Sequence, residues 1–169
     1  MTGRRPVSSF RTGSDMSFSQ DRFPPAIDPS SQPGDPASAK GPGDHVRVLV
    51  VDDDLSMCKL LRMMLEPKGF EVLEAFSGVR GLVMAKGELP DIVLLDIMMP
   101  DIDGFGVCRE LKLDPKTKDI PIIFVTAMSG QEHLDRGMSL GAQGYITKPF
   151  RPEVLIEKLY EVIDRADGT

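Results

Sequence analysis

Short apolar runs alternate with segments of helical periodicity from Val46 onward, and this alternation limits the fold more than any other feature of the chain. The apolar runs predict strands over residues 46–51, 70–75, 91–95, 121–125 and 143–147. The segments between them predict helices near residues 55–67, 77–87, 104–113, 130–141 and 151–165. Such alternation is typical of a doubly wound α/β fold, in which helices cover both faces of one parallel sheet.

Local signals support these helices. Ser77 is expected to cap the second helix, because its hydroxyl can accept a hydrogen bond from a free backbone N–H of the first turn. Pro152 suits the first turn of the last helix, where a missing N–H costs little. In the first helix, a core-facing stripe is predicted from apolar residues at helical spacing: Met57, Leu60, Leu61, Met64 and Leu65.

Four of the predicted strands end in polar residues. The first ends at Asp52–Asp54, the third at Asp96, the fourth at Thr126 and the fifth at Lys148. In a doubly wound sheet, ligands bind beyond the carboxyl ends of the strands, at the point where the strand order reverses. Strands one and three flank that point in the order 2-1-3-4-5, so their acids are expected to converge there.

This set of side chains suits a divalent metal and a phosphoryl group. Clustered carboxylates repel one another unless a cation lies among them, and Mg²⁺ takes oxygen ligands such as one or two carboxylates, a carbonyl and waters. A carboxylate can also accept a phosphoryl group covalently, and the ammonium of Lys148 could pair with that group. Asp54 could be only a helix cap. The chain has no glycine-rich phosphate loop, so a nucleotide is not the expected donor.

Four motifs, taken in order, resemble the receiver domain of bacterial two-component response regulators over about residues 45–165. They are Val50–Asp54, Leu95–Gly104, Val125–Ala127 and Gly141–Phe150. The resemblance implies a flavodoxin-like (βα)5 fold with strand order 2-1-3-4-5 and a receiver domain over residues 45–169.

The resemblance also implies a role for each residue at the strand ends. Asp96 would be the phosphoacceptor and also a ligand of Mg²⁺. Asp53 would bind the metal directly, Asp52 would act on it largely through water, and Met98 would give its backbone carbonyl.

Three further residues match the family's switch. Thr126 would supply the switch hydroxyl and Lys148 the ammonium that pairs with the phosphoryl group. Tyr145 matches the aromatic residue whose rotamer follows activation. The implied donor is the phosphohistidine of a sensor histidine kinase or of a phosphotransfer protein. Phosphorylation would then switch the surface made by the fourth helix, the fifth strand and the fifth helix.

The resemblance implies a signalling domain with at most slow self-dephosphorylation, not an enzyme. Because few residues follow the last predicted helix, we expect a single-domain regulator that docks to an output partner, as a monomer or a phosphorylation-dependent dimer. The last helix carries two adjacent apolar rows, of which one should face the core and the other could be a docking surface. These rows are Leu155-Leu159-Val162 and Ile156-Tyr160-Ile163.

Residues 1–44 differ in composition from the rest of the chain. They are rich in Pro, Ser and Gly, balanced in charge and poor in large apolar residues, so they predict a disordered extension. The extension could be a tether or docking segment, a flexible tail, or an over-long start with Met16 as the true first residue.

Composition limits which kinds of partner the chain is expected to bind and in which cellular compartment it is expected to work. The net charge of −6 argues against a nucleic-acid surface, and no apolar run reaches the length of a membrane span. Because no charged n-region is followed by an apolar h-region, we expect no secretion signal. Cys58 and Cys108 lack metal-ligand spacing, so we expect free thiols in a reducing cytoplasm.

Two other functions share some of these features. A metal-dependent phosphatase with an aspartate nucleophile would need a second Asp two residues after the first, but Met98 stands there. Asp101 and Asp103 have that spacing, yet they follow Pro100 in a predicted turn. The other alternative is a docking module that does not respond to phosphorylation.

Overall fold

The computed structural model describes residues 46–167, so the predicted extension over residues 1–44 lies outside the described residues. The strands are β1 (Arg47–Val51), β2 (Glu71–Ala75), β3 (Ile92–Leu95), β4 (Ile122–Thr126) and β5 (Gly144–Thr147). The helices are α1 (Leu55–Leu65), α2 (Gly78–Glu88), α3 (Gly104–Leu113), α4 (Gln131–Ser139) and α5 (Pro152–Asp167), with a short 3-10 turn, η1 (Glu66–Lys68), after α1. Each predicted element is therefore present within a few residues of its predicted bounds.

The strands form one parallel sheet in the order β2-β1-β3-β4-β5, which confirms the predicted topology. In this order β1 and β3 are neighbours, and their register pairs Val51 with Leu95. Asp52 and Asp96 follow these paired residues directly. The two acids therefore leave adjacent strands at the same level, at the predicted reversal point.

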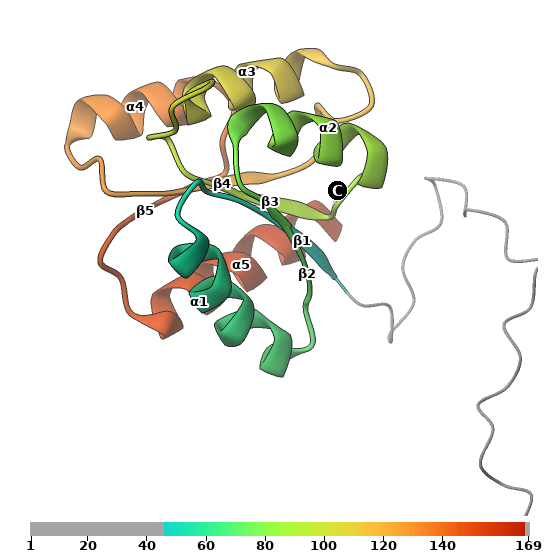
Figure 1. The fold of residues 1–169 in the computed structure, drawn as a ribbon, viewed down its shortest axis with the longest axis vertical. Coiled ribbons are helices and arrows are strands. Elements are labelled where there is room, and N and C mark those ends of the chain that lie inside the picture. The colour runs from blue at the N-terminus through green and yellow to red at the C-terminus, as the bar shows by residue number, and fades with distance from the viewer. Residues whose placement is uncertain (1–45, 168–169) are drawn as a thin grey trace, which may run out of the picture. The chain divides into compact units, whose positions relative to one another are not determined.

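Helices cover both faces of the sheet, with α1 and α5 on one face and α2, α3 and α4 on the other (Figure 1). Alternate residues of β1 point to the two sides. Val48 and Val50 pack toward α1 and α5, whereas Leu49 and Val51 pack toward α2 and α3. Burial on both faces explains why β3 and β4 are apolar almost throughout.

The core-facing stripe predicted for α1 is partly wrong. The buried residues are Cys58, Leu61 and Leu65, while Leu60 is 41% exposed. The inward row follows the helical spacing from Cys58, a small apolar residue that packs well in a core and that the prediction left out. Both cysteines are free and buried, as expected for structural thiols.

The helix starts agree with the local signals. The Ser77 hydroxyl accepts a hydrogen bond from the Arg80 N–H, and α5 begins at Pro152. Asp54 caps α1 by accepting from the N–H of Ser56 at 2.9 Å. Within residues 46–167, no helix has both the length and the apolar character that crossing a membrane requires.

Candidate functional site

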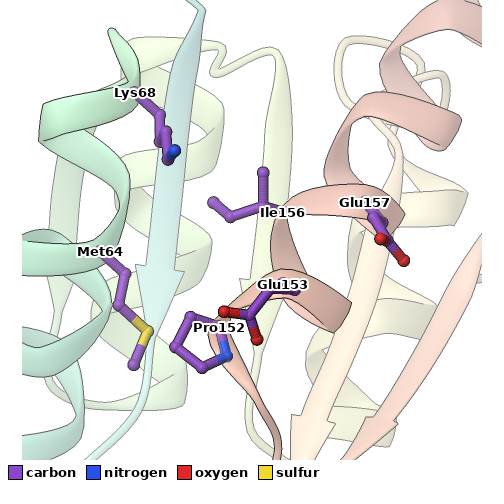
Figure 2. Close-up of a pocket in the computed structure, with 6 residues that line it drawn as sticks. All are labelled: Met64, Lys68, Pro152, Glu153, Ile156 and Glu157. Carbon is purple, nitrogen blue, oxygen red and sulfur yellow. The ribbon is translucent and has the colours of Figure 1, made fainter.

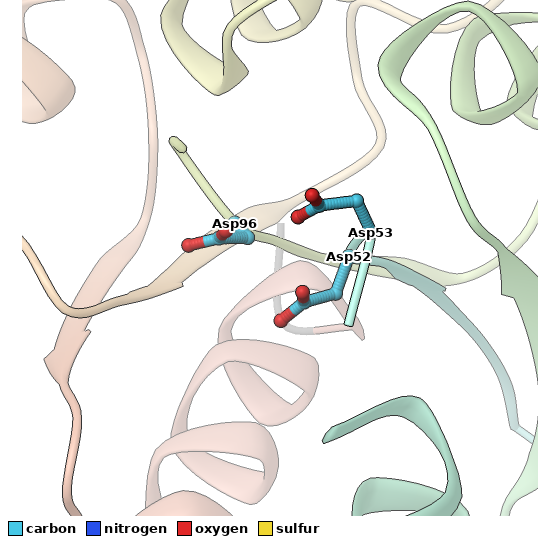
Figure 3. A group of neighbouring side chains, drawn as sticks. All are labelled: Asp52, Asp53 and Asp96. Carbon is cyan, nitrogen blue, oxygen red and sulfur yellow. The ribbon is translucent and has the colours of Figure 1, made fainter. Parts of the chain in front are cut away.

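Asp52, Asp53 and Asp96 come together at the carboxyl edge of the sheet (Figure 3). Carboxylate oxygens of the three residues all lie within 4.8 Å of one another. Asp52 and Asp53 follow β1, and Asp96 follows β3. Asp52 and Asp96 are 3% and 6% exposed, whereas Asp53 is exposed to solvent. The cluster therefore has a buried base and one side open to water.

Lys148 reaches the same cluster from the end of β5. Its Nζ lies 2.6 Å from Asp52 Oδ2 and 3.8 Å from Asp96 Oδ1. The Lys148 N–H donates to the Thr126 carbonyl at 2.8 Å, and the peptide bond that follows, to Pro149, is cis. The ammonium of Lys148 therefore already pairs with carboxylates of the cluster, and Asp52 is the closer partner. One ammonium faces three carboxylates.

The environment of Asp96 opposes its negative charge. Burial raises the pKa of the Asp96 carboxyl, and the nearby Asp52 carboxylate adds to the rise. The Lys148 ammonium and hydrogen bonds from the Thr126 hydroxyl and the Ile97 N–H lower this pKa without cancelling the rise. Asp96 Oδ1 is buried and accepts no hydrogen bond from the described residues. A buried carboxylate oxygen that accepts no hydrogen bond lowers the stability of the fold unless another group, such as a cation, binds it.

A divalent cation fits these residues. The donor set consists of carboxylates, which are hard oxygen ligands of the kind that Mg²⁺ prefers. The Asp96 oxygen without a hydrogen bond provides a free ligand position, and exposed Asp53 leaves room for retained waters. Met98, the predicted carbonyl ligand, lies in the β3–α3 loop two residues after Asp96, with its side chain 60% exposed.

Thr126 and Tyr145 hold the same peptide segment of the β4–α4 loop. Thr126, the fully buried last residue of β4, accepts a hydrogen bond at Oγ1 from the Met128 N–H at 3.3 Å. The Tyr145 hydroxyl donates to the Met128 carbonyl at 2.9 Å. The Tyr145 ring also lies 5.9 Å from the ring of Phe124, between centroids. Two of the three predicted switch residues, Thr126 and Tyr145, therefore meet at the backbone of Met128.

A cavity of about 470 Å³ adjoins the acidic cluster and is largely apolar in its walls. Three methionines and the guanidinium of Arg136, which lies 4.2 Å above the Phe105 ring, contribute to it. The lining residues are Asp53, Ile97, Met98, Met99, Pro100, Asp103, Phe105, Met128 and Arg136.

A second cavity, of about 310 Å³, lies between α1 and α5 and contains none of the predicted site residues (Figure 2). Its lining residues are Met64, Lys68, Pro152, Glu153, Ile156 and Glu157.

The two apolar rows of α5 differ in burial. Every residue of the Leu155-Leu159-Val162 row is buried, which confirms that one row faces the core. In the other row Ile156 and Ile163 pack against that core, and Tyr160 is 45% exposed with its ring 5.6 Å from that of Phe70. This second row is mainly structural.

Sequence reasoning missed the role of Asp101. Its carboxylate accepts hydrogen bonds from the N–H groups of Gly78 and Val79, at the start of α2. These contacts span more than twenty residues of chain, so no local pattern predicts them. The available signal is an acid directly after Pro100, in a segment that the sequence predicts only as a turn.

Comparison with known proteins assigns the fold to a family. The sequence model of the response regulator receiver domain matches residues 48–160. The DNA-binding dual master transcriptional regulator RpaA of Synechocystis sp. is 36% identical over 121 residues, which are 72% of this chain and 50% of RpaA. The response regulator PleD of Caulobacter vibrioides is 43% identical over 113 residues, 67% of this chain and 25% of PleD. The chain thus spans half or less of the length of these curated relatives.

Solved structures agree with the sequence comparison. A CheY-like receiver domain protein from Methanospirillum hungatei superposes with a TM-score of 0.68 at 32% identity, covering 73% of this chain and 98% of that one. Residues 48–160, which the sequence model matches, contain all five strands except the first residue of β1, together with the acids at the carboxyl edge of the sheet. The chain therefore belongs to the response regulator receiver domain family.

Proposed function

We propose that Asp96 accepts a phosphoryl group in a Mg²⁺-dependent reaction, with the phosphohistidine of a sensor kinase or phosphotransfer protein as donor. The observation that supports this most is the buried Asp96 oxygen that accepts no hydrogen bond within residues 46–167, beside two further acids and the Lys148 ammonium. A carboxylate oxygen of Asp96 forms the new bond to phosphorus as the P–N bond of the donor breaks.

The surrounding residues have separate tasks in this proposal. Asp53, Asp96 and the Met98 carbonyl hold the metal, and Asp52 contacts it through water. Bound Mg²⁺ offsets negative charge on the transferring group. Lys148, already 3.8 Å from Asp96 Oδ1, pairs with the phosphoryl group in the product. The lysine then exchanges part of its contact with Asp52 for the new phosphoryl oxygens.

Phosphorylation also reaches the surface of α4, β5 and α5. Phosphoaspartate carries a charge of about −2 and three strong acceptor oxygens, so it competes for the Thr126 hydroxyl. Because Thr126 and Tyr145 hold the two sides of the Met128 peptide segment, a movement of Thr126 frees Tyr145 to change rotamer. A local charge thereby biases a two-state element. Unchanged hydrogen exchange over residues 126–163 after phosphorylation would contradict this switch.

The output is proposed to be docking to a protein partner through that surface, by residues 45–169 acting as one receiver domain. RpaA is described as a DNA-binding regulator, but this chain matches only half of it, and the net charge of −6 does not favour direct binding of nucleic acid. A cytoplasmic location follows from the proposed donor. The proposed oligomeric state is a monomer or a phosphorylation-dependent dimer.

Labelling with a small phosphodonor tests the proposal. The purified protein is incubated with acetyl phosphate, in Mg²⁺ or in EDTA, and its intact mass is measured. We expect a phospho-adduct only in Mg²⁺ for the native protein and for the matched control Asp54→Asn, and none for Asp96→Asn. Asp54 is a suitable control because it is a neighbouring acid that caps α1. A full adduct on Asp96→Asn would overturn the assignment, and no adduct on any variant would favour a docking module.

A further inference from the structure

We propose that Asp101 is a positioning residue for the metal site: by binding the start of α2, its carboxylate fixes the β3–α3 loop that presents the Met98 carbonyl. The inference rests on the proposed function, because it concerns the same metal. It adds a residue that lies outside the acidic cluster and that contacts neither the metal nor the phosphoryl group.

The contact joins two segments that are distant in sequence. Asp101 Oδ1 accepts from the Gly78 N–H at 3.1 Å, and Oδ2 accepts from the Val79 N–H at 2.8 Å. Both carboxylate oxygens are used, which fixes the side chain in orientation as well as in distance. The Val79 N–H and other backbone donors lower the pKa of Asp101 to about 2, so the group is ionised at neutral pH.

The loop is fixed at its other end by Ile97. The Ile97 carbonyl accepts hydrogen bonds from the N–H groups of Met99, at 3.1 Å, and Gly104, at 2.9 Å. Position 104 lies so close to the backbone of Asp96 that any side chain there would overlap the Asp96 carbonyl oxygen, and its Cβ would lie 2.7 Å from the Ile97 Cα. The loop therefore closes tightly on the phosphoacceptor.

Residues 98–100 lie between these two fixed points. Met98 is 60% exposed, so side-chain packing does little to hold it. Its carbonyl position then depends on Ile97 on one side and on Asp101 on the other. Losing the Asp101 contact would leave the outer end of this short segment held mainly by Ile102, which packs against the core cluster beside α2.

Asp101 is one of two side chains that cap the start of α2. The N-cap Ser77 already accepts a hydrogen bond from the Arg80 N–H at 3.1 Å. The two capping side chains, Ser77 and Asp101, bind different N–H groups of α2. Of the two, only Asp101 belongs to the β3–α3 loop. This difference separates a stabilising role from a positioning role.

The test compares Asp101→Ala and Asp101→Asn with the matched control Ser77→Ala. Each alanine variant should be somewhat less stable than the native protein in denaturant unfolding, because it loses one cap of α2. Mg²⁺ affinity is measured by calorimetric titration on the unphosphorylated protein. For Asp101→Ala we expect affinity to fall by roughly tenfold, the lower end of the range for groups that orient metal ligands. Ser77→Ala should retain native affinity.

Asp101→Asn keeps one acceptor oxygen and should lie between the native protein and Asp101→Ala. Native Mg²⁺ affinity in Asp101→Ala would overturn the positioning role, as would an equal loss in Ser77→Ala. Failure of the native protein itself to bind Mg²⁺ would instead count against the proposed function, so the two failures are distinguishable.

Discussion

The two ends of the central sheet place similar groups of charged side chains in different surroundings. At the amino end, Arg47 pairs with Glu88 at 2.7 Å and with Glu71 at 3.5 Å, and its N–H donates to Asp91 at 2.7 Å. At the carboxyl end, three carboxylates meet one ammonium, and Asp96 has a buried oxygen that accepts no hydrogen bond from residues 46–167. Each end sets one cation beside three carboxylates, but the acids at the amino end are exposed or half-buried, whereas Asp52 and Asp96 at the carboxyl end are buried.

The difference indicates which end was shaped by function. Exposed ion pairs contribute little to stability, typically between about 0 and 1 kcal/mol each. Like charges brought together out of water oppose folding. A fold that keeps such a cluster gives up stability there, which is expected where the cluster performs a task such as binding a cation.

The largest effect should come from a direct metal ligand. We expect Asp53→Ala to lower Mg²⁺ affinity by more than about tenfold, which is the loss typical even of outer groups around a metal. Asp54→Ala should leave the affinity nearly unchanged and lower only stability, because Asp54 caps α1. Calorimetric titration of both variants gives the comparison. An equal loss of affinity in the two would mean that the ligand is misassigned.

A smaller effect, on the rate of phosphoaspartate hydrolysis, is expected from the two methionines beside the acidic cluster. Hydrolysis of phosphoaspartate needs a water held in line for attack, and neither Met98 nor Met128 offers a strong hydrogen bond to hold one. The native protein should therefore lose its phosphoryl group more slowly than the double variant Met98→Asn, Met128→Glu, by roughly tenfold or about 1.4 kcal/mol of barrier.

Decay after removal of the donor, in Mg²⁺, measures this difference. Met99→Gln is a suitable control, because Met99 lines the same cavity but is not predicted to border the water approach. Equal decay rates in the native protein and the double variant would refute the water-access argument.

A substitution at the amino end of the sheet should change stability and Mg²⁺ affinity least. We expect Arg47→Ala to lower the unfolding free energy by about 1 kcal/mol or less, through its lost ion pairs and hydrophobic stem. Phosphorylation by acetyl phosphate and Mg²⁺ affinity should stay at native levels. Denaturant unfolding and the labelling assay test the two statements. A loss of Mg²⁺ binding in Arg47→Ala would show that the two ends are coupled.

The sequence was sufficient to predict the fold and the convergence of the acids, because both follow from short-range patterns. The apolar runs fix the strands, and each acid stands directly after its strand, as Asp96 does after Leu95. The strand order brings β1 beside β3, so no long-range detail was needed to place Asp52 near Asp96. The roles of these residues in phosphoryl transfer stay predictions.

What the sequence could not provide depends on packing between distant segments. The contact of Asp101 with α2 and the hold of Tyr145 on the Met128 carbonyl both join separate elements. The exposure of Leu60 has a similar origin, because the direction of α1 on the sheet decides which apolar residues face inward. Periodicity predicts that a helix has an apolar face but does not fix its edges.

The most direct test of the account is the stability of Asp96→Asn with and without Mg²⁺. Because burial raises the pKa of Asp96, the ionised carboxylate opposes folding. This loss of folding stability is absent below the ordinary carboxyl pKa of about 3.9. It grows as the pH rises from there through the raised pKa that Asp96 has in the folded protein. An uncharged Asn avoids it, so in EDTA at neutral pH we expect this variant to be more stable than the native protein, by up to about 1 kcal/mol.

Saturating Mg²⁺ should reverse the order. At a concentration of about 100 times the dissociation constant, the metal should add about 2.7 kcal/mol to the native protein and clearly less to Asp96→Asn. Denaturant unfolding of both proteins in EDTA and in Mg²⁺ gives the four free energies. The account expects Asp96→Asn to be the more stable in EDTA and the native protein to be the more stable in Mg²⁺. Lower stability of Asp96→Asn in EDTA, or equal stabilisation of both proteins by Mg²⁺, would contradict it.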